Sequence, residues 1–325
     1  MHIFHNTNFD FLRWRWHAIA LSTLVILAGV AVIASRGLNL GIEFSGGTSI
    51  IAKFDQPVAI DAVRSALAAN YPGGAEATIN TYGDPASNQV MVRVPQVGQE
   101  SGSALSTTAQ QVENALRQGN LGNLSVVGTE VVGPAVGEEL TEKGFYAFVF
   151  SLLAILAYIA FRFQFSFALG AVVATLHDVL VTVAFLAFFG YDITLNVIAA
   201  ILTVTGYSTN DTIVIFDRVR ENMRFTRGKS LYDTINIALN QTLSRTVITA
   251  GTAFLSAVAL FLFGGDVLRG FAFSMVVGIV TGTYSSVFVA AAIVMFWQRK
   301  KTVGVAEATP AAAKRAKAQR KARAS

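Results

Sequence analysis

Polar residues interrupt an apolar segment, 193–216, that is otherwise long enough to cross a membrane. One of them, Asp211, is ionisable, and an ionisable side chain at hydrocarbon depth costs free energy, so it needs a partner or a function. At about 3.6 residues per turn, five of the polar residues fall within an arc of about 100° on a helix. They are Asn196, Thr203, Tyr207, Asn210 and Asp211. We expect this stripe to face other helices rather than lipid, so the helix lines something polar.

An arginine begins the next apolar segment, on the side of the membrane where this one ends. Asp211 lies six residues before Asp217, which is about 9 Å along a helix axis, and Arg245 precedes the following span. If the two side chains meet, protonation of the carboxylate depends on whether the guanidinium is near and whether the site is wet. A proton relay requires such coupling. The alternatives are an arginine that only reaches the membrane interface and an aspartate that only makes a structural hydrogen bond.

Polar residues recur on the neighbouring apolar segments. They are Thr175, Asp178 and Thr182 with the adjacent His177; Thr249, Thr252 and Ser256 after Arg245; and a small-residue face of Ser274, Gly278, Thr281, Gly282 and Ser285. We predict one polar seam, in which Asn196, Thr203, Tyr207, Asn210, His177, Asp178 and Thr249 support Asp211 and Arg245. His177 and Asp178 lack a third ligand, so they predict a packed polar pair rather than a metal site. Protons are the expected coupling ion, without another cofactor.

Composition places these segments in a membrane protein. Apolar residues make up 53% of the chain and charged residues 14%, and there is no cysteine, which excludes disulfides and thiolate chemistry. Runs near twenty apolar residues predict six spans: 17–35, 144–161, 166–189, 193–216, 246–264 and 271–297. A cleavable signal peptide is the alternative for the first span, but its apolar region exceeds the usual length of about 7–15 residues.

The distribution of Lys and Arg predicts the orientation. Basic residues gather before the first span, between the second and third, between the fourth and fifth, and after the sixth, so these segments are expected in the cytoplasm. In the insert 37–143, acidic residues outnumber basic ones eleven to five. We therefore expect both termini to be cytoplasmic and 37–143 to be periplasmic.

The insert 37–143 is long enough for one small domain. Segments 48–54, 77–82, 89–94 and 124–132 predict strands, and 57–70 and 103–118 predict helices. The β-α-β-β-α-β order is that of a ferredoxin-like domain. The insert has no histidine and its acidic residues are scattered, so we expect no enzyme activity there. Gly46 and Gly47 predict a turn or a close backbone approach rather than a phosphate-binding loop, because no helix start follows them.

The junctions divide the chain into 1–36, 37–143, 144–297 and 298–325. Gly133, Pro134 and Gly137 precede the second span and predict either a hinge or a rigid turn. A cytoplasmic loop is expected at 217–245, with an interfacial helix that Ser230 and Asp233 start as a capping box. The basic tail 298–325 is expected to be a solvated cytoplasmic flank, with anionic lipid or the ribosome as alternative contacts.

Five motifs together resemble a known family. They are GIEFSGGT at 41–48, VGPAVGEEL at 132–140, His-Asp at 177–178, GYSTNDT at 206–212 and FDRVREN at 216–222. This pattern, over positions 8 to 300, is similar to the SecF subunits of the bacterial SecD–SecF translocation accessory complex, in the RND superfamily. Thr209 stands where an aliphatic residue is expected, which adds polarity without changing the assignment.

The resemblance implies a six-helix, RND-like half in the bacterial inner membrane that pairs with a SecD-like subunit. It implies association with the SecYEG channel, with YajC and YidC as further candidate partners, an unfolded preprotein as substrate, and no nucleic acid. Proton flow would assist export on the periplasmic side, and the family's proton-conducting residues match Asp211 and Arg245.

Two other classes of protein share part of this pattern. A proton-coupled small-molecule exporter of the RND type would share the intramembrane acid, but it needs a larger outer domain and two six-helix halves. A scaffold that only stabilises a translocon would explain the topology but not Asp211.

Overall fold

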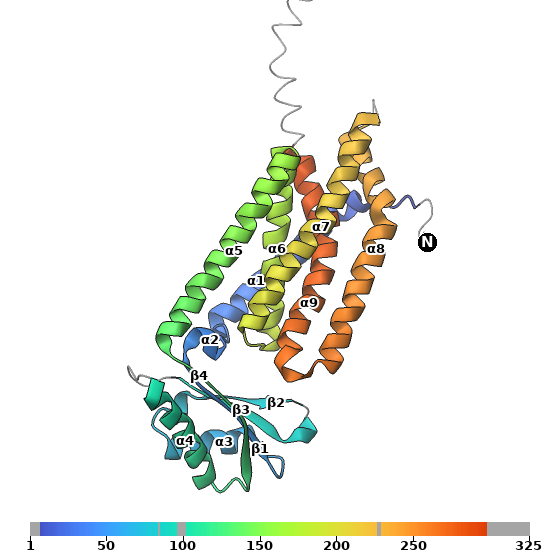
Figure 1. Ribbon diagram of the computed structural model, residues 1–325. Helices are drawn as coiled ribbons and strands as arrows, with labels where there is room; N and C mark the ends of the chain where they lie inside the picture. The colour runs from blue at the N-terminus through green and yellow to red at the C-terminus, as the bar shows by residue number, and fades with distance from the viewer. Residues whose placement is uncertain (1–6, 84, 96–101, 226–228, 298–325) are drawn as a thin grey trace, which may run out of the picture.

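The computed structural model describes residues 7–83, 85–95, 102–225 and 229–297, and in them a small sheet domain lies at one end of a bundle of long helices (Figure 1). The bundle helices are α1 (Arg15–Arg36), α5 (Pro134–Arg162), α6 (Phe165–Phe189), α7 (Leu195–Phe225), α8 (Leu231–Phe263) and α9 (Gly265–Ser285). A short 3₁₀ turn, η1 (Phe11–Trp14), precedes α1, and a π-helical turn, η4 (Ser286–Ala290), continues α9.

Length and composition mark five stretches of the described chain as able to cross a membrane: Phe11–Arg36, Pro134–Arg162, Phe165–Phe189, Leu231–Phe263 and Gly265–Trp297. The segment 193–216, predicted as the remaining span, lies in α7, whose polar residues lower its hydropathy. Nevertheless α7 is part of the bundle, since it packs against α6, α8 and α9. The prediction of a helical membrane protein with several apolar helices is confirmed.

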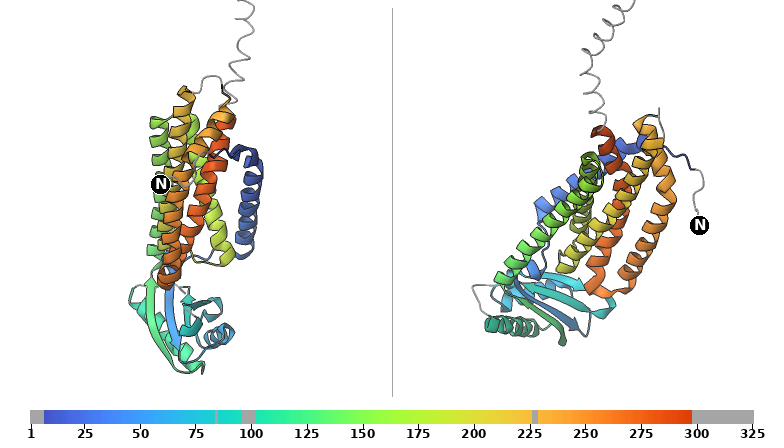
Figure 2. Two further views of the ribbon diagram at one scale, coloured as in Figure 1. Left: turned by 90° about the vertical axis from the view of Figure 1, so that its right-hand side faces the viewer. Right: turned by 45° about the horizontal axis from the view of Figure 1, so that its top comes forward.

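α6 and α9 form the centre of the bundle. α6 packs against α1, α5, α7 and α9, while α9 also contacts α8 (Figures 1 and 2). Small residues permit this close packing: a Cβ added at Gly278 would overlap the side chain of Val204, and one at Gly282 would lie 2.8 Å from Ser208 Cβ. Peripheral helices expose large apolar side chains, including Leu24 of α1, Phe150 of α5 and Leu255 of α8.

The helices extend beyond the predicted membrane spans. α5 begins at Pro134, ahead of the predicted span 144–161, and the segment 217–245, predicted as a cytoplasmic loop, is largely helical. α7 continues to Phe225 and α8 begins at Leu231, so the predicted interfacial helix is the first part of α8. At about 1.5 Å per residue, helices of 31 and 33 residues exceed the roughly 30 Å hydrocarbon thickness, so their charged ends can project into water without breaking the helix.

The predicted cap of this segment is confirmed. Ser230 is the N-cap of α8, and its hydroxyl accepts from the backbone N–H of Asp233. Ile235, Ala238 and Leu239 are buried in the main apolar core, which explains why the segment continues the bundle helix instead of lying on a membrane surface.

The sheet domain has the predicted element order. β1 (Gly47–Phe54), α3 (Ile60–Asn70), β2 (Thr78–Tyr82), β3 (Gln89–Val94), α4 (Gly102–Gln118) and β4 (Leu124–Val132) follow one another, with short turns η2 (Gly74–Glu76) and η3 (Pro85–Ser87). The strands pair in the order β2-β3-β1-β4, with every pair antiparallel. An apolar core that includes Val63, Val92 and Leu116 joins the sheet to α3 and α4.

The glycine pair before β1 is a close approach of two backbones. Gly46 and Gly47 have φ of 67° and 122°, and a Cβ at Gly47 would overlap the carbonyl oxygen of Val94. The short helix α2 (Ile42–Ser45) precedes them and packs against α5. The predicted close backbone approach is therefore confirmed.

The N-terminal segment is attached to α8 at the end of the bundle opposite the sheet domain (Figure 1). Asn240 Oδ1 accepts from Phe9 N at 2.8 Å, and Asn236 Nδ2 donates to Phe9 O at 2.9 Å. The last turns of the described chain, after α9, reach this same end. The two ends of the described chain thus share one side of the bundle, as the charge pattern predicts.

Candidate functional site

Asp211 lies on α7 where this helix contacts α8. Its carboxylate is half-buried, and Thr246 Oγ1 of α8 donates to Oδ1 at 2.8 Å. The other oxygen, Oδ2, is shielded from solvent and has no hydrogen-bond partner among the described residues. A buried polar atom without a partner is costly, so this oxygen is the natural position for a proton or for a group that this chain does not supply.

Arg245 is the residue before Thr246, but no ion pair joins its side chain to Asp211 among the described residues. Arg245 is exposed, and within the described ranges no acidic side chain approaches its guanidinium within ion-pair distance. The helices that carry Asp211 and Arg245 therefore contact each other as predicted. The side chain that bonds to Asp211 is that of Thr246. The sequence analysis missed Thr246. Its position directly after Arg245, at the start of the polar ridge that Arg245 forms with Thr249, Thr252 and Ser256, could have identified it.

The predicted stripe on α7 does not face the other helices of this chain. Asn196, Thr203 and Asn210 are exposed, and Tyr207 and Asp211 are half-buried at the edge of the same face. The ridge on α8 is open as well, since Arg245, Thr249, Thr252 and Ser256 are exposed. These two surfaces, which we call the open face, meet at the contact between Asp211 and Thr246.

A second polar cluster lies on the buried side of α7. Asp178 of α6 is completely buried, and its Oδ2 accepts from Ser208 Oγ of α7 at 2.5 Å and from Ser285 Oγ of α9 at 2.8 Å. His177 Nδ1 lies 3.1 Å from Asp178 Oδ1. The predicted single seam is thus two separate sets: the open face and this inner cluster of His177, Asp178, Ser208 and Ser285.

The predicted packed pair of His177 and Asp178 is observed. Throughout the described residues, no three His, Cys, Asp or Glu side chains gather closely enough to hold a metal ion. Each of the two sets places a carboxylate beside hydroxyl groups, and the inner cluster adds an imidazole, so both sets contain groups that can hold a proton.

The sheet domain is fastened to the bundle next to the start of α7. Arg93 of β3 forms an ion pair with Asp192, which precedes α7, at 2.6 Å, and both side chains are largely buried. Ile193 N donates to Asn39 O at 2.7 Å and Gly41 N donates to Ile193 O at 2.8 Å. Displacement of the domain would therefore act directly on the end of α7.

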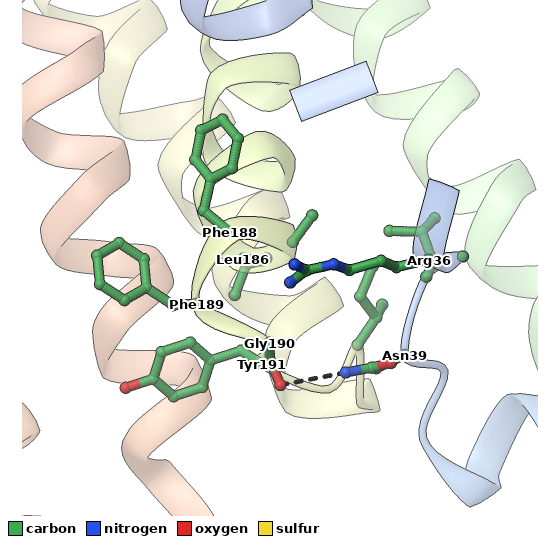
Figure 3. Close-up of a pocket in the computed structure, with 11 residues that line it drawn as sticks. Arg36, Asn39, Leu186, Phe188, Phe189, Gly190 and Tyr191 are labelled. Carbon is green, nitrogen blue, oxygen red and sulfur yellow. Dashed lines mark hydrogen bonds between the residues drawn. The ribbon is translucent and has the colours of Figure 1, made fainter. Parts of the chain in front are cut away.

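A pocket lies beside these bonds, between the end of α1 and the end of α6. Figure 3 shows Arg36, at the end of α1, extending toward α6, and Asn39 donating to Gly190 O at 3.2 Å. Phe188, Phe189 and Tyr191 line the same pocket. The turn between α6 and α7 is thus held by the segment that leads from α1 into the sheet domain.

The candidate hinge residues form a tight junction. Gly133 is the N-cap of α5, Pro134 is its first residue, and Gly137 lies within its first turns. A Cβ on Gly46 would lie 3.2 Å from Pro134 Cα, and one on Gly137 would lie 2.9 Å from Phe44 O. The geometry is that of a closely packed helix start, which resembles the rigid turn more than the hinge.

Comparisons with known proteins agree over nearly the whole chain. The family described as "Protein export membrane protein SecD/SecF, C-terminal" matches residues 111–300, and the "SecD/SecF GG Motif" matches 31–58. Protein translocase subunit SecF of Desulfurispirillum indicum is 42% identical, with 89% of this chain and 91% of that protein covered. SecF of Escherichia coli O157:H7 is 39% identical, with 88% and 87% covered.

Solved structures show the same fold. The crystal structure of SecDF, a translocon-associated membrane protein from Thermus thermophilus, matches with a TM-score of 0.80 and 33% identity over 90% of this chain. A SecDF structure in a super-membrane-facing form matches with a TM-score of 0.66. This chain spans 39% and 40% of those two longer chains.

Proposed function

Because the chain belongs to the SecD/SecF protein-export family, as a SecF protein translocase subunit, we propose that it uses the proton-motive force to assist SecYEG-dependent translocation. The single observation that carries the proposal is the Asp211 carboxylate, which has one oxygen bonded to Thr246 and the other without a partner. A carboxylate poised between two helices in this way can take up a proton on the free oxygen and change its bond to the other helix.

The energy available to such a site is substantial. Each proton that crosses the full membrane potential supplies about 2.3 kcal/mol per 100 mV. The ion pair between Arg93 and Asp192 connects the α7 end of the bundle to the sheet domain, so movement of α7 has a direct route to that domain. Preprotein on the periplasmic side would be pulled or released by the resulting domain movement.

The open face requires a partner within the membrane. Exposed Asn196, Thr203, Asn210 and Arg245 would otherwise meet lipid, where polar side chains are costly. We assign this face to a SecD-like subunit whose helices cover it, in line with the match to SecDF chains that are longer than this one. The partner would also complete the surroundings of Asp211. SecYEG is the further partner, with YajC and YidC as additional candidates.

The orientation follows from the charge pattern. We count α7 as a membrane-spanning helix in addition to the other five, which gives six spans in all. We place both termini in the cytoplasm and the sheet domain on the periplasmic side of a bacterial inner membrane. We name the domain ferredoxin-like because its element order and antiparallel strand order are those of that fold. Its work is mechanical rather than enzymatic.

Orientation can be tested with single cysteines, since the chain has none of its own. A cysteine replacing exposed Glu76 in the sheet domain should react with an impermeant thiol reagent added to spheroplasts, and one replacing exposed Arg224 at the end of α7 should not. The reverse labelling pattern would overturn the topology.

The function is tested by proton flux and preprotein release in vesicles that contain the chain with its SecD-type partner and SecYEG. Asp211→Asn should assemble, because the side chains are nearly isosteric, but lose proton-dependent stimulation of release. Asp217→Asn is the matched control, since Asp217 lies on the same helix but its side chain is 60% exposed. Wild-type flux and release in Asp211→Asn would refute proton coupling at this residue and favour a scaffold.

A further inference from the structure

The inner cluster contains a buried carboxylate that the proposed relay does not use. We propose that Asp178 and His177 together bind a proton of their own, as a second protonation site where α7 packs against α6 and α9 rather than against α8. This inference rests on the proposed proton-coupled function. It starts from the position of Asp178, which is completely buried where α6, α7 and α9 meet.

The charge of the pair depends on one proton. With a hydrogen on Nδ1 donated to Asp178 and none on Nε2, the imidazole is neutral and the pair carries one negative charge. A further proton, on Nε2 or on a carboxylate oxygen, makes the pair neutral overall. Burial of an uncompensated charge is expensive, so this one proton decides whether the core contains such a charge.

His177 has an open position for this proton. Its Nε2 atom is shielded from solvent and finds no hydrogen-bond partner anywhere in the described residues. The side chain as a whole is 11% exposed, while that of Asp178 is 1% exposed, so the imidazole is the member of the pair closer to the surface. It therefore offers the entry point, and Asp178 is the group behind it.

The elements packed around α6 offer few competing ionisable groups. Tyr284 of α9 stacks on His177 with ring centroids 6.4 Å apart. The middle parts of these helices add Asp211 and Tyr207 of α7 and Tyr146 and Tyr158 of α5; α1 carries none between His17 and Arg36, and η4 carries none. The remaining charged residues lie toward the helix ends: Glu138, Glu139, Glu142, Lys143 and Arg162 of α5, Asp217, Arg218, Arg220, Glu221 and Arg224 of α7, and Asp266 and Arg269 of α9. No basic side chain bonds to Asp178 in the described chain apart from His177, so the imidazole is its counter-charge.

Protonation of Asp178 would change its hydrogen bonds to the neighbouring helices α7 and α9. Oδ2 accepts from both Ser208 and Ser285, which uses the two lone pairs of that oxygen. A proton placed on Oδ2 occupies one lone pair, so one serine must turn its O–H away and accept instead. The bond between α6 and α7, or the one between α6 and α9, is thereby reversed.

This change lies close to Asp211 along α7. Ser208 precedes Asp211 by three residues, so the two lie on adjacent turns of one helix. Further hydroxyl contacts lie beside Ser208. Ser286 Oγ lies 2.7 Å from Thr212 Oγ1 and donates to Ser208 O at 3.5 Å. α7 therefore makes two carboxylate–hydroxyl contacts, Asp178–Ser208 with α6 and Asp211–Thr246 with α8.

Asp178→Asn separates proton binding from packing. An asparagine can accept from both serines through its amide oxygen and donate to His177 Nδ1 in the other tautomer, so the hydrogen bonds survive while the titratable group is lost. His177→Gln is a second variant that retains a polar side chain at a partly accessible position. Both are read in the complex with the SecD-type partner, and co-purification with the partner verifies assembly.

The decisive measurement is infrared difference spectroscopy of the reconstituted complex as the pH is changed. In Asp211→Asn, a protonated carboxyl band should still appear and disappear with pH, and Asp178→Asn added to this variant should abolish the band. His177→Gln should shift the pH at which the band appears. In flux assays with Asp211 intact, Asp178→Asn should change the pH profile of proton flux.

The outcomes distinguish the two proposals. If adding Asp178→Asn to Asp211→Asn leaves the carboxyl difference bands unchanged, or if Asp178→Asn retains the wild-type band and pH profile, the second site is refuted and the proposed function stands. If Asp211→Asn leaves proton flux and release unchanged, the proposed function fails, whatever the infrared bands of Asp178 show.

Discussion

The two sides of α7 differ in how completely this chain satisfies their polar groups. On the inner side, both oxygens of Asp178 are bonded to groups of α6, α7 and α9. On the open face, Asp211 has one bonded oxygen and Arg245 is exposed. On the inner side the carboxylate is fully bonded and the unpartnered atom is His177 Nε2, whereas on the open face the Asp211 carboxylate itself has an oxygen without a partner among the described residues. Changes on the two sides should therefore have different consequences.

The largest effect is expected from Asp178→Leu. It leaves Ser208, Ser285 and His177 without their shared acceptor in the core, and loss of one partner of a buried network of this kind costs about 3–5 kcal/mol. Chemical unfolding in mild detergent measures the loss of stability. Asp217→Leu, at an exposed position on α7, should change stability by less than about 0.5 kcal/mol. Equal losses of stability in Asp178→Leu and Asp217→Leu would contradict the idea that the inner cluster holds the fold together.

A smaller effect is expected from Gly278→Ala. The added methyl group would overlap Val204 where α9 meets α7, and overpacking of this kind costs about 1–3 kcal/mol. Gly206→Ala is the matched control on the open face, where an added Cβ meets nothing within 4 Å. The control should leave the isolated chain intact but weaken co-purification with a SecD-type partner. A destabilised chain with Gly206→Ala would contradict the assignment of that face.

Arg93→Gln tests the fastening at the end of α7 next to the sheet domain. It breaks the ion pair with Asp192, which is partly screened by solvent, so we expect a local loss of about 1–2 kcal/mol. Faster hydrogen exchange at the amides of Gly41 and Ile193, which bridge the domain and the bundle, would report it. Lys53→Gln, at an exposed position on β1, should leave these amides unchanged.

The smallest effect on stability is expected from Thr246→Val. It removes the donor to Asp211 and should cost about 0.5–1.5 kcal/mol, yet it should impair proton flux because the carboxylate loses its contact with α8. Thr252→Val is the control, since Thr252 bonds to carbonyls of its own helix. Unchanged flux in Thr246→Val would show that this contact is structural only.

Local patterns were sufficient for much of the fold. Segments rich in Val and Ile with flanking turns predicted β1, β3 and β4 closely, because strand propensity and turn chemistry are properties of short segments. Helix ends were predicted less well. Hydropathy shows where a segment leaves hydrocarbon, but a helix continues while its backbone bonds and buried face continue, as Ile235 and Leu239 show in α8.

The sequence by itself determined that α7 carries an ionisable group and a polar stripe, that His177 and Asp178 are adjacent, and that basic segments alternate with apolar ones. Only the tertiary structure decided that Asp178 meets Ser208 and Ser285, that Thr246 rather than Arg245 contacts Asp211, and that the stripe lies on the open face. The physical reason is that helical periodicity specifies which residues share a face, whereas the packing of neighbouring helices specifies what covers that face.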